Sequence, residues 1–395
     1  MVMESGGTVA SDYRTRVVSS LSQLDASAWN ALARQSADGA LPAFLRHEFL
    51  DALERSGCVG EPSGWVPEFV VLESREPKSR GLRAAAPLYR KFHSWGEYVF
   101  DWAWADAYQR HGLRYYPKLV GAIPFTPVTG ARLLASDEHA RSALADAVLE
   151  HARGADVSSL HVLFPRERER EALCARGMMG RESVQFHWHN RAYRDFDQFL
   201  ASLAQPKRKK IRAERRKVRD AGVSFERLEG GAIRQAHWDF FSHCYASTYA
   251  AHGSTPYLTS EFFLRIGASM PENLIMVLAH RAGRPIAASL LVRDRDRLYG
   301  RYWGTVEPQP MLHFETAYYQ AIEIAIELGI AVIEGGAQGE HKMARGFVPE
   351  RTGSAHWLAE PAFADAVQRF LEREGALVAH YADELRERAP FRGGR

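Results

Sequence analysis

Two stretches of the chain repeat the same order of short hydrophobic runs bounded by turn residues. The first begins at residues 67–73 (PEFVVLE), continues at 82–89 (LRAAAPLY) and reaches an aromatic run at 98–104 (YVFDWAW). The second passes through residues 271–280 (PENLIMVLAH), 285–292 (PIAASLLV) and 298–304 (LYGRYWG). Because β-branched and aromatic runs between turn residues are typical of strands, each stretch predicts a β-hairpin followed by a third strand.

A helix and a further strand follow each predicted trio of strands. Residues 137–153 carry apolar side chains at helical spacing, and residues 159–164 (SLHVLF) indicate a buried strand. In the second stretch, residues 312–328 are strongly helical, Gly329 suits a helix end, and residues 331–336 (AVIEGG) follow as a strand. This order predicts an α/β fold with mixed sheets covered by helices, built as a tandem repeat. We place an N-terminal domain at residues 1–190 and a C-terminal domain at 191–395.

Composition supports a globular protein of two domains. The chain has 395 residues, more than one core usually holds, and its 46% hydrophobic and 25% charged residues exclude a disordered or fibrous chain. The three cysteines form no CxxC pair, so neither a disulfide framework nor a zinc knuckle is indicated. No apolar run approaches the ~20 residues that span a bilayer, and the N-terminal residues do not resemble a signal peptide, so we expect a cytoplasmic protein.

Most of the positive charge lies in one segment. Residues 207–219 (KRKKIRAERRKVR) hold nine basic residues and one acid, whereas the net charge of the whole chain is only +3. Their helix propensity, with Pro206 at the start and Gly222 after the end, predicts a helix over 206–220. Its cationic face is either a solvated surface or a site for an anionic ligand: tRNA, a CoA phosphate, or a phosphorylated lipid or nucleotide precursor. The candidate phosphate-binding residues are Lys207, Arg208, Lys210 and Arg212.

The densest group of chemically active residues follows the last predicted buried strand, at residues 334–347 (EGGAQGEHKMARGF). Glycines there let the backbone approach a ligand closely, while polar side chains crowd the same turn. Glu340 or His341 has the chemistry to accept a proton from an attacking amine, and Lys342 or Arg345 could stabilise an oxyanion or bind a phosphate or carboxylate. Glu334 and Gln338 are candidate substrate-binding residues. The alternative is an ordinary glycine-rich loop with exposed charges.

Further candidate binding residues occur in both halves. On the predicted strand 298–304, Arg301 and Trp303 share one face, and His313, Glu315 and Tyr318 lie at the start of the following helix. In the first half, Thr126 and Thr129 offer hydroxyl groups within residues 124–134, which indicate a kinked or splayed strand. Core packing, helix-dipole compensation and local backbone hydrogen bonds are the competing explanations for these residues.

Common nucleotide, hydrolase and metal signatures are missing. The chain contains no Walker P-loop, no GxGxxG after an early strand, no GxSxG elbow and no HExxH. His187 and His189 share a strand face but lack a third ligand, so we predict no metal site.

Several motifs together resemble a known family. They are residues 115–134 (YYPKLVGAIPFTPVTGARLL), the basic segment, residues 298–304, residues 312–320 (LHFETAYYQ) and residues 334–357, which begin EGGAQGEHKMARGF. In this order they resemble the FemAB-like proteins of the GNAT acyltransferase superfamily, in the bacterial group associated with peptidoglycan biosynthesis or recognition. The resemblance extends from about Leu41 to about Arg388.

The resemblance implies two GNAT-like domains in tandem and transfer of an acyl or aminoacyl group to a small-molecule amine. Acyl-CoA or aminoacyl-tRNA would serve as co-substrate, with no tightly bound cofactor. Lys342, Gly346 and Phe347 resemble the Lys and Gly-Phe that close the family's last motif. The loop that holds the acetyl-CoA pyrophosphate in ordinary acetyltransferases is absent from both halves, which favours another donor. The alternatives are a non-catalytic recognition module for a cell-wall or nucleotide-bearing ligand, and a nucleic-acid binder acting through the basic helix.

Overall fold

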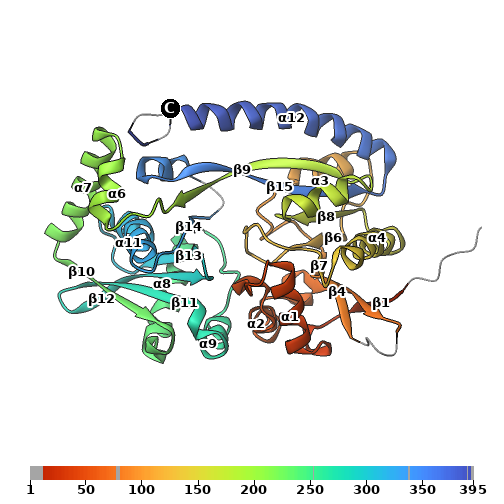
Figure 1. Cartoon of the computed structure of the whole chain (residues 1–395), viewed down its shortest axis with the longest axis horizontal. Helices are drawn as coiled ribbons and strands as arrows, with labels where there is room; N and C mark the ends of the chain where they lie inside the picture. The colour runs from red at the N-terminus through yellow and green to blue at the C-terminus, as the bar shows by residue number, and fades with distance from the viewer. Residues whose placement is uncertain (1–11, 77–80, 252, 337–338, 389, 393–395) are drawn as a thin grey trace, which may run out of the picture.

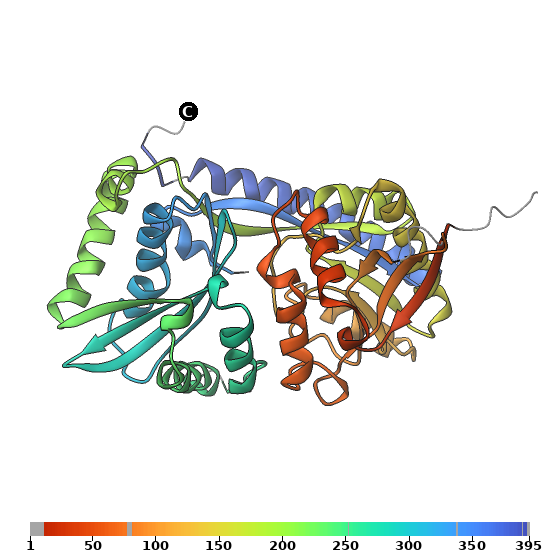
Figure 2. The same cartoon turned by 60° about the horizontal axis from the view of Figure 1, so that its bottom comes forward.

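The computed structural model describes residues 12–76, 81–251, 253–336, 339–388 and 390–392. These residues form two sheets: a four-stranded sheet in the order β1-β3-β4-β7 and an 11-stranded sheet in the order β10-β11-β12-β13-β14-β9-β15-β8-β6-β5-β2. Helices lie on the faces of the sheets (Figures 1 and 2), which confirms the predicted α/β class with mixed sheets.

The first half of the chain begins in the four-stranded sheet. It ends in a long strand of the 11-stranded sheet. Its elements are β1 (Tyr13–Val18), α1 (Ala26–Ser36), α2 (His47–Arg55), β2 (Trp65–Pro67), β3 (Phe69–Ser74), β4 (Leu82–Ala86), β5 (Leu88–Lys91), α3 (Trp102–Arg110), β6 (Lys118–Gly121), β7 (Leu134–Ala135), α4 (Glu138–Gly154), β8 (Ser159–Leu163), α5 (Glu167–Cys174) and β9 (Met179–His189).

The second half begins with a short helix followed by the basic helix, and it ends with a long helix that lies along β9 and β15. Its elements are α6 (Phe196–Ser202), α7 (Gln205–Asp220), β10 (Val223–Glu229), α8 (Gln235–Ala251), α9 (Ser260–Ser269), β11 (Leu274–Arg281), β12 (Arg284–Arg293), β13 (Arg297–Thr305), α10 (Leu312–Phe314), a π-helical turn η7 (Glu315–Tyr319), α11 (Gln320–Glu327), β14 (Val332–Glu334), a 3-10 segment η8 (Glu340–Arg345), β15 (Val348–Leu358) and α12 (Pro361–Glu387).

Most predicted elements are confirmed. Both hairpins form, with β3 antiparallel to β4 and β11 antiparallel to β12. The basic helix is α7, and Gly329 takes a positive φ of 66° just after α11, as its role at a helix end requires.

Two predictions about the first half are wrong. Residues 98–104 do not form a strand: α3 begins at Trp102, because Trp104 and Tyr108 lie four apart and are buried on one helix face. The third strand is instead β6, which runs parallel to β8. Residues 124–133 form a connection rather than a splayed strand, and only Leu134–Ala135 pair with β4.

The two halves share one sheet because they exchange strands. β9 of the first half pairs with β14 of the second, and β15 of the second half lies between β9 and β8. Figure 1 shows β9 and β15 running side by side across both halves, with α12 along them. A hydrophobic cluster also crosses the boundary: Phe44 contacts Tyr299 at a ring distance of 4.9 Å, and Phe49 contacts Phe262 at 5.4 Å. Residues that lie between the halves are therefore held by both.

Candidate active site

The candidate site lies where two strands of the second half separate. β13 and β14 are paired in parallel only through residues 297–299 and 332–334. Just beyond, Leu291 is opposite Gly300 and Leu290 is opposite Tyr302, so Arg301 is an extra, bulged residue. A bulge redirects the side chain that it carries. The Arg301 guanidinium extends to the first half and donates a hydrogen bond to the Phe125 carbonyl oxygen at 2.6 Å.

Lys342 lies on η8, directly after the glycine-rich segment. It is only 2% exposed, and its ammonium donates to the Gly336 carbonyl oxygen at 2.9 Å. Burial, together with the charge of Arg301, lowers the pKa of Lys342 to about 8. Glycine at 335 makes room for this side chain, because a Cβ there would lie 3.3 Å from Lys342 Cδ and Cε. Lys342 is therefore a buried cation that forms no ion pair with a described carboxylate.

Several buried polar atoms near this divergence lack hydrogen-bond partners among the described residues. Glu334, which ends β14, accepts from Arg297 at 2.6 Å, but its other oxygen, Oε2, is unpartnered. Arg301 Nε and Trp303 Nε1 are unpartnered as well. Burial raises the pKa of Glu334 to about 7, although Arg297 acts in the opposite direction. Buried polar groups are normally satisfied, so this set indicates a place that takes a polar ligand.

Aromatic and imidazole rings form a wall beside Lys342. The Trp303 and His313 rings are 4.7 Å apart, and the His313 and Tyr318 rings are 5.4 Å apart. The Tyr318 hydroxyl lies 3.3 Å from His341 Nε2. Burial and nearby cations lower the pKa of His313 to about 4, and the same causes lower that of His341. Both imidazoles are therefore neutral at pH 7. The structure brings together Arg301, Trp303, His313, Tyr318, Glu334, His341 and Lys342, all of which the sequence predicts as site residues.

The inner face of α7 is tied to this site through Glu214. Arg345 donates to both oxygens of Glu214, at 3.0 and 2.9 Å, and Tyr319 donates to the same carboxylate. The Arg345 guanidinium also donates to the His341 carbonyl oxygen at 2.7 Å and lies 3.4 Å from the centre of the Phe314 ring. Arg345 thus fixes η8, the segment that carries Lys342.

A second tie joins α7 to the helix after β13. Arg215 donates to both oxygens of Glu315 and forms an ion pair with Glu323 at 2.7 Å. Gln320 adds a hydrogen bond to Glu315 at 2.9 Å. Glu315 is 3% exposed, and its charge is balanced within the protein.

The remaining predicted site residues that the structure describes form no hydrogen bond with this group. Glu340 is exposed and accepts from the Tyr381 hydroxyl on α12 at 2.6 Å. Thr126 donates to the Pro124 carbonyl oxygen at 2.9 Å, whereas the buried Thr129 hydroxyl has no partner among the described residues. Gln338 lies outside the described residues.

The outer face of α7 is strongly cationic. Lys209, Lys210, Arg212, Arg216, Lys217 and Arg219 are exposed, and Lys207 and Arg208 are half-buried. Of the predicted phosphate-binding residues, Arg208 and Arg212 line a groove of about 430 Å³. Arg212 also lines a neighbouring groove of about 550 Å³ with Arg215, Arg216 and Arg219. Figure 1 shows α7 at the outer end of the second half, away from the first half.

Three residues that hold the site together are not identified from the sequence: Glu214, Arg215 and Arg297. One signal could have found Glu214: it is the single acid in a run of nine bases, and a buried partner explains an acid there.

The described residues gather no group of three or more side chains suited to hold a metal ion. His189 pairs with Glu350 at 2.8 Å, and His187 faces Glu334 at 3.9 Å. Within the described ranges, every helix is too short or too polar to cross a membrane.

Comparison with solved structures identifies relatives of the same fold. FemX superposes with a TM-score of 0.55 at 12% identity, covering 86% of this chain and 98% of FemX. The C-terminal domain (DUF2156) of a proposed lysylphosphatidylglycerol synthetase from Agrobacterium fabrum gives a TM-score of 0.52 at 10% identity, covering 87% of this chain and 96% of that domain. A conserved protein of unknown function from Bacteroides thetaiotaomicron gives 0.51 at 11% identity, covering 87% of this chain and 99% of that chain. At these identities the likeness shows the fold alone.

Sequence comparison assigns the family. No curated protein sequence matches the chain significantly. Residues 20–393, nearly the whole chain, match the FemAB-like family, described as peptidoglycan biosynthesis/recognition. The sheet shared by the two halves, the FemX-like fold and this match agree with the FemAB-like resemblance seen in the motifs. The chain belongs to the FemAB-like family.

Proposed function

We propose that the protein transfers an aminoacyl group from aminoacyl-tRNA to an amine acceptor. The observation that carries this proposal is a pair of cations at the divergence of β13 and β14: Lys342, which is buried, and Arg301, which is half-buried. When an amine attacks an ester carbonyl, the carbonyl oxygen becomes negatively charged. Fixed cations in a water-poor site stabilise that charge strongly.

The proposed reaction assigns a role to each nearby group. The amine nitrogen bonds to the ester carbonyl carbon, and the bond from that carbon to the ribose oxygen of tRNA breaks. His341, kept neutral by burial and nearby cations, accepts the proton that the amine loses. Lys342 stabilises the oxyanion by its charge, and the proton taken up by His341 passes to the leaving ribose oxygen. Glu340 is a weaker candidate for the base, because its carboxylate accepts from Tyr381.

The outer face of α7 supports tRNA as the donor. At 1.5 Å per residue, its 16 residues extend over roughly 24 Å and carry six exposed cations. A CoA pyrophosphate needs only a few contacts, whereas a polynucleotide backbone occupies the whole length. The inner face of the same helix contacts the site through the ion pair between Glu214 and Arg345. α7 therefore connects the proposed tRNA-binding surface to η8.

The experiment supplies the full chain with both kinds of donor, aminoacyl-tRNA and acyl-CoA. Bulk tRNA charged with radiolabelled amino acids and radiolabelled acyl-CoA thioesters are each incubated with amine-bearing peptides and amino sugars. We expect label to pass from tRNA only. Lys342→Ala should lower the rate by about 100-fold or more. Arg369→Ala, which removes an exposed cation from α12, should leave the rate unchanged.

The pH profile checks the role of Lys342 separately. Because Lys342 loses its proton near pH 8, the wild-type rate should fall as pH rises through that value. Lys342→Arg should remove this fall, because a guanidinium stays charged. Full activity in Lys342→Ala would refute the site. Transfer from CoA thioesters alone would mean that an acyl-CoA is the donor. Salt-sensitive tRNA binding without transfer would favour a nucleic-acid binder acting through the basic helix.

A further inference from the structure

The segment between β5 and α3 exposes a cluster of large aromatic side chains. Trp95, Phe100 and Trp102 are 59%, 56% and 40% exposed. With Ser94, Gly96, Tyr98 and Tyr257 they line a pocket of about 330 Å³. Tyr257 comes from the second half, so both halves contribute to the wall. Exposed aromatic groups around a hollow indicate a binding site rather than a requirement of the fold.

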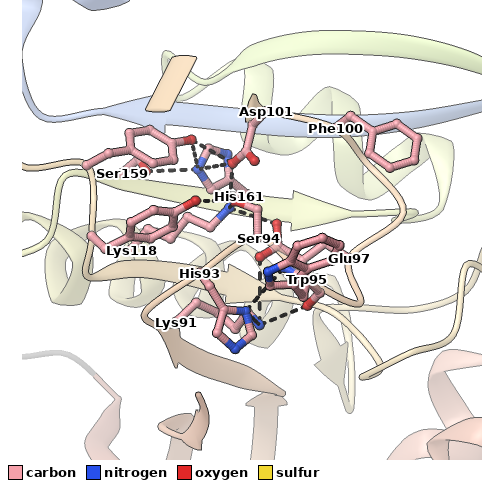
Figure 3. Close-up of polar contacts among 12 residues, drawn as sticks. Lys91, His93, Ser94, Trp95, Glu97, Phe100, Asp101, Lys118, Ser159 and His161 are labelled. Atoms are coloured by element: carbon pink, nitrogen blue, oxygen red, sulfur yellow. Dashed lines mark hydrogen bonds and ion pairs between the residues drawn. The ribbon is translucent and has the colours of Figure 1, made fainter. Parts of the chain in front are cut away.

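The pocket wall is held rigidly from beneath by buried charges (Figure 3). Lys118 is fully buried and donates to Ser94 Oγ and Glu97 Oε2, each at 2.8 Å, and to Asp101. Lys91, also fully buried, donates to the Trp95 carbonyl oxygen at 3.1 Å. These contacts fix Ser94, Trp95, Glu97 and Asp101 within one short segment. Such preorganisation lowers the entropy lost on binding.

The aromatic rings themselves are also fixed. Gly96 has a positive φ of 81°, and a Cβ there would meet the Phe125 ring at 2.6 Å, so the segment packs closely on Phe125. Phe125 in turn stacks on Tyr257, with ring centres 5.0 Å apart and planes 13° apart. Trp95 and Trp102 pack edge to face at 5.0 Å. Trp95, Trp102 and Tyr257 therefore form a preformed part of the pocket wall.

The charges around the pocket favour a cation. The seven lining residues include no basic side chain. Lys118 faces Glu97 and Asp101, and one oxygen of each carboxylate, Glu97 Oε1 and Asp101 Oδ1, has no hydrogen-bond partner among the described residues. Burial raises the pKa of Glu97 to about 7, whereas Lys118 holds the pKa of Asp101 below its usual range although burial acts in the opposite direction. Asp101 therefore balances the charge of Lys118, and Glu97 adds a partial negative charge. Lys91, 3.9 Å from Glu97 Oε1, has its pKa lowered by burial to about 6, so it is mostly uncharged at neutral pH. The nearby Arg181 is paired with Glu374 at 2.8 Å. Aromatic faces carry negative potential and attract ammonium groups.

We propose that the pocket formed by Trp95, Tyr98, Phe100, Trp102 and Tyr257 binds the alkylammonium group of a ligand. None of the seven lining residues takes part in the proposed transfer reaction, and binding to the pocket is measured without any donor or transfer. The probes are choline and its uncharged carbon analogue, 3,3-dimethylbutan-1-ol, which have nearly the same shape. Ligand-observed NMR at constant ionic strength gives the dissociation constant of each with the full chain.

We expect choline to bind at least about tenfold more tightly than the alcohol. Trp95→Leu with Trp102→Leu should weaken choline binding about tenfold or more, while Phe370→Leu, an exposed position on α12 that does not line this pocket, should not. Should the double variant fail to fold, Trp95→Leu alone serves, because that side chain is 59% exposed. Equal affinity for the alcohol would overturn the proposal in favour of a purely apolar site. Binding of neither probe, or choline binding unaffected by the tryptophan substitutions, would overturn it outright.

Discussion

Replacing Glu214 by glutamine should destabilise the protein through the charge left on Arg345. The side chains of Arg345 and Glu214 are 2% and 8% exposed, and the two guanidinium contacts are 3.0 and 2.9 Å. Glutamine keeps the size of the side chain but removes its charge. Arg345 would then remain buried without a carboxylate partner, although the His341 carbonyl oxygen and the Phe314 ring still contact it.

The expected loss can be worked out from these contacts. Removing one partner of a buried ion pair typically costs ~3–5 kcal/mol, because the other charge stays buried and unpaired. Glutamine can still accept one hydrogen bond, and Phe314 still covers the guanidinium. We therefore expect a loss at the lower end, about 3 kcal/mol, which lowers the folding equilibrium constant roughly 150-fold.

Urea unfolding at pH 7, followed by tryptophan fluorescence, measures this loss. Asp197→Asn is the matched control, because it removes the exposed 3.7 Å pair with Arg212 on the same helix. That change should cost no more than ~0.5 kcal/mol. The double variant Glu214→Gln with Arg345→Met, which removes both charges, should recover part of the stability. A loss below about 1 kcal/mol for Glu214→Gln would refute the reasoning.

Two further predictions concern packing and strand exchange. Gly304→Ala should lower the free energy of unfolding by about 3 kcal/mol or prevent folding, because its Cβ would lie 1.9 Å from the Cys244 carbonyl oxygen of α8. Gly375→Ala, in α12 with open space around it, should instead raise the free energy of unfolding by ~0.5–1 kcal/mol in the same urea assay. A fragment of residues 1–190 should lack cooperative unfolding by circular dichroism, because β8 loses its partner β15, and a peptide of residues 346–392 should restore it. Stable, cooperative folding of the fragment alone would contradict this.

Local sequence signals were enough to predict most helices and strands. They did not predict where a strand bulges or where an aromatic run forms a helix. The hairpins, α4, α7 and β8 follow from periodicity, turn residues and charge that lie next to each other in the chain. α3 was misassigned because its aromatic residues favour strands, although Trp104 and Tyr108 pack at helical spacing. The bulge at Arg301, which redirects that side chain beside the divergence of β13 and β14, leaves no mark in the sequence.

The groups that fix the sites come from distant parts of the chain. Glu214 and Arg345 are 131 residues apart, and His161 and His356, which share a 2.7 Å contact beside the buried lysines, are 195 apart. Pairings of this kind depend on the strand order, which the sequence pattern did not reveal. β15 is an example, because Pro349 and Gly353 weaken it as a strand on sequence grounds.

The position of β15 also sets a delay during synthesis of the protein. β8 is made early, yet the strand that covers it ends at Leu358, so about 170 residues after residue 190 must be translated first. At ~5–20 residues per second this takes on the order of 10 to 30 s. During that time the edge of β8 is open to other strands, including those of neighbouring nascent chains. We therefore expect the yield of folded protein to depend more on ribosome spacing and chaperone supply than on the stability of the folded state.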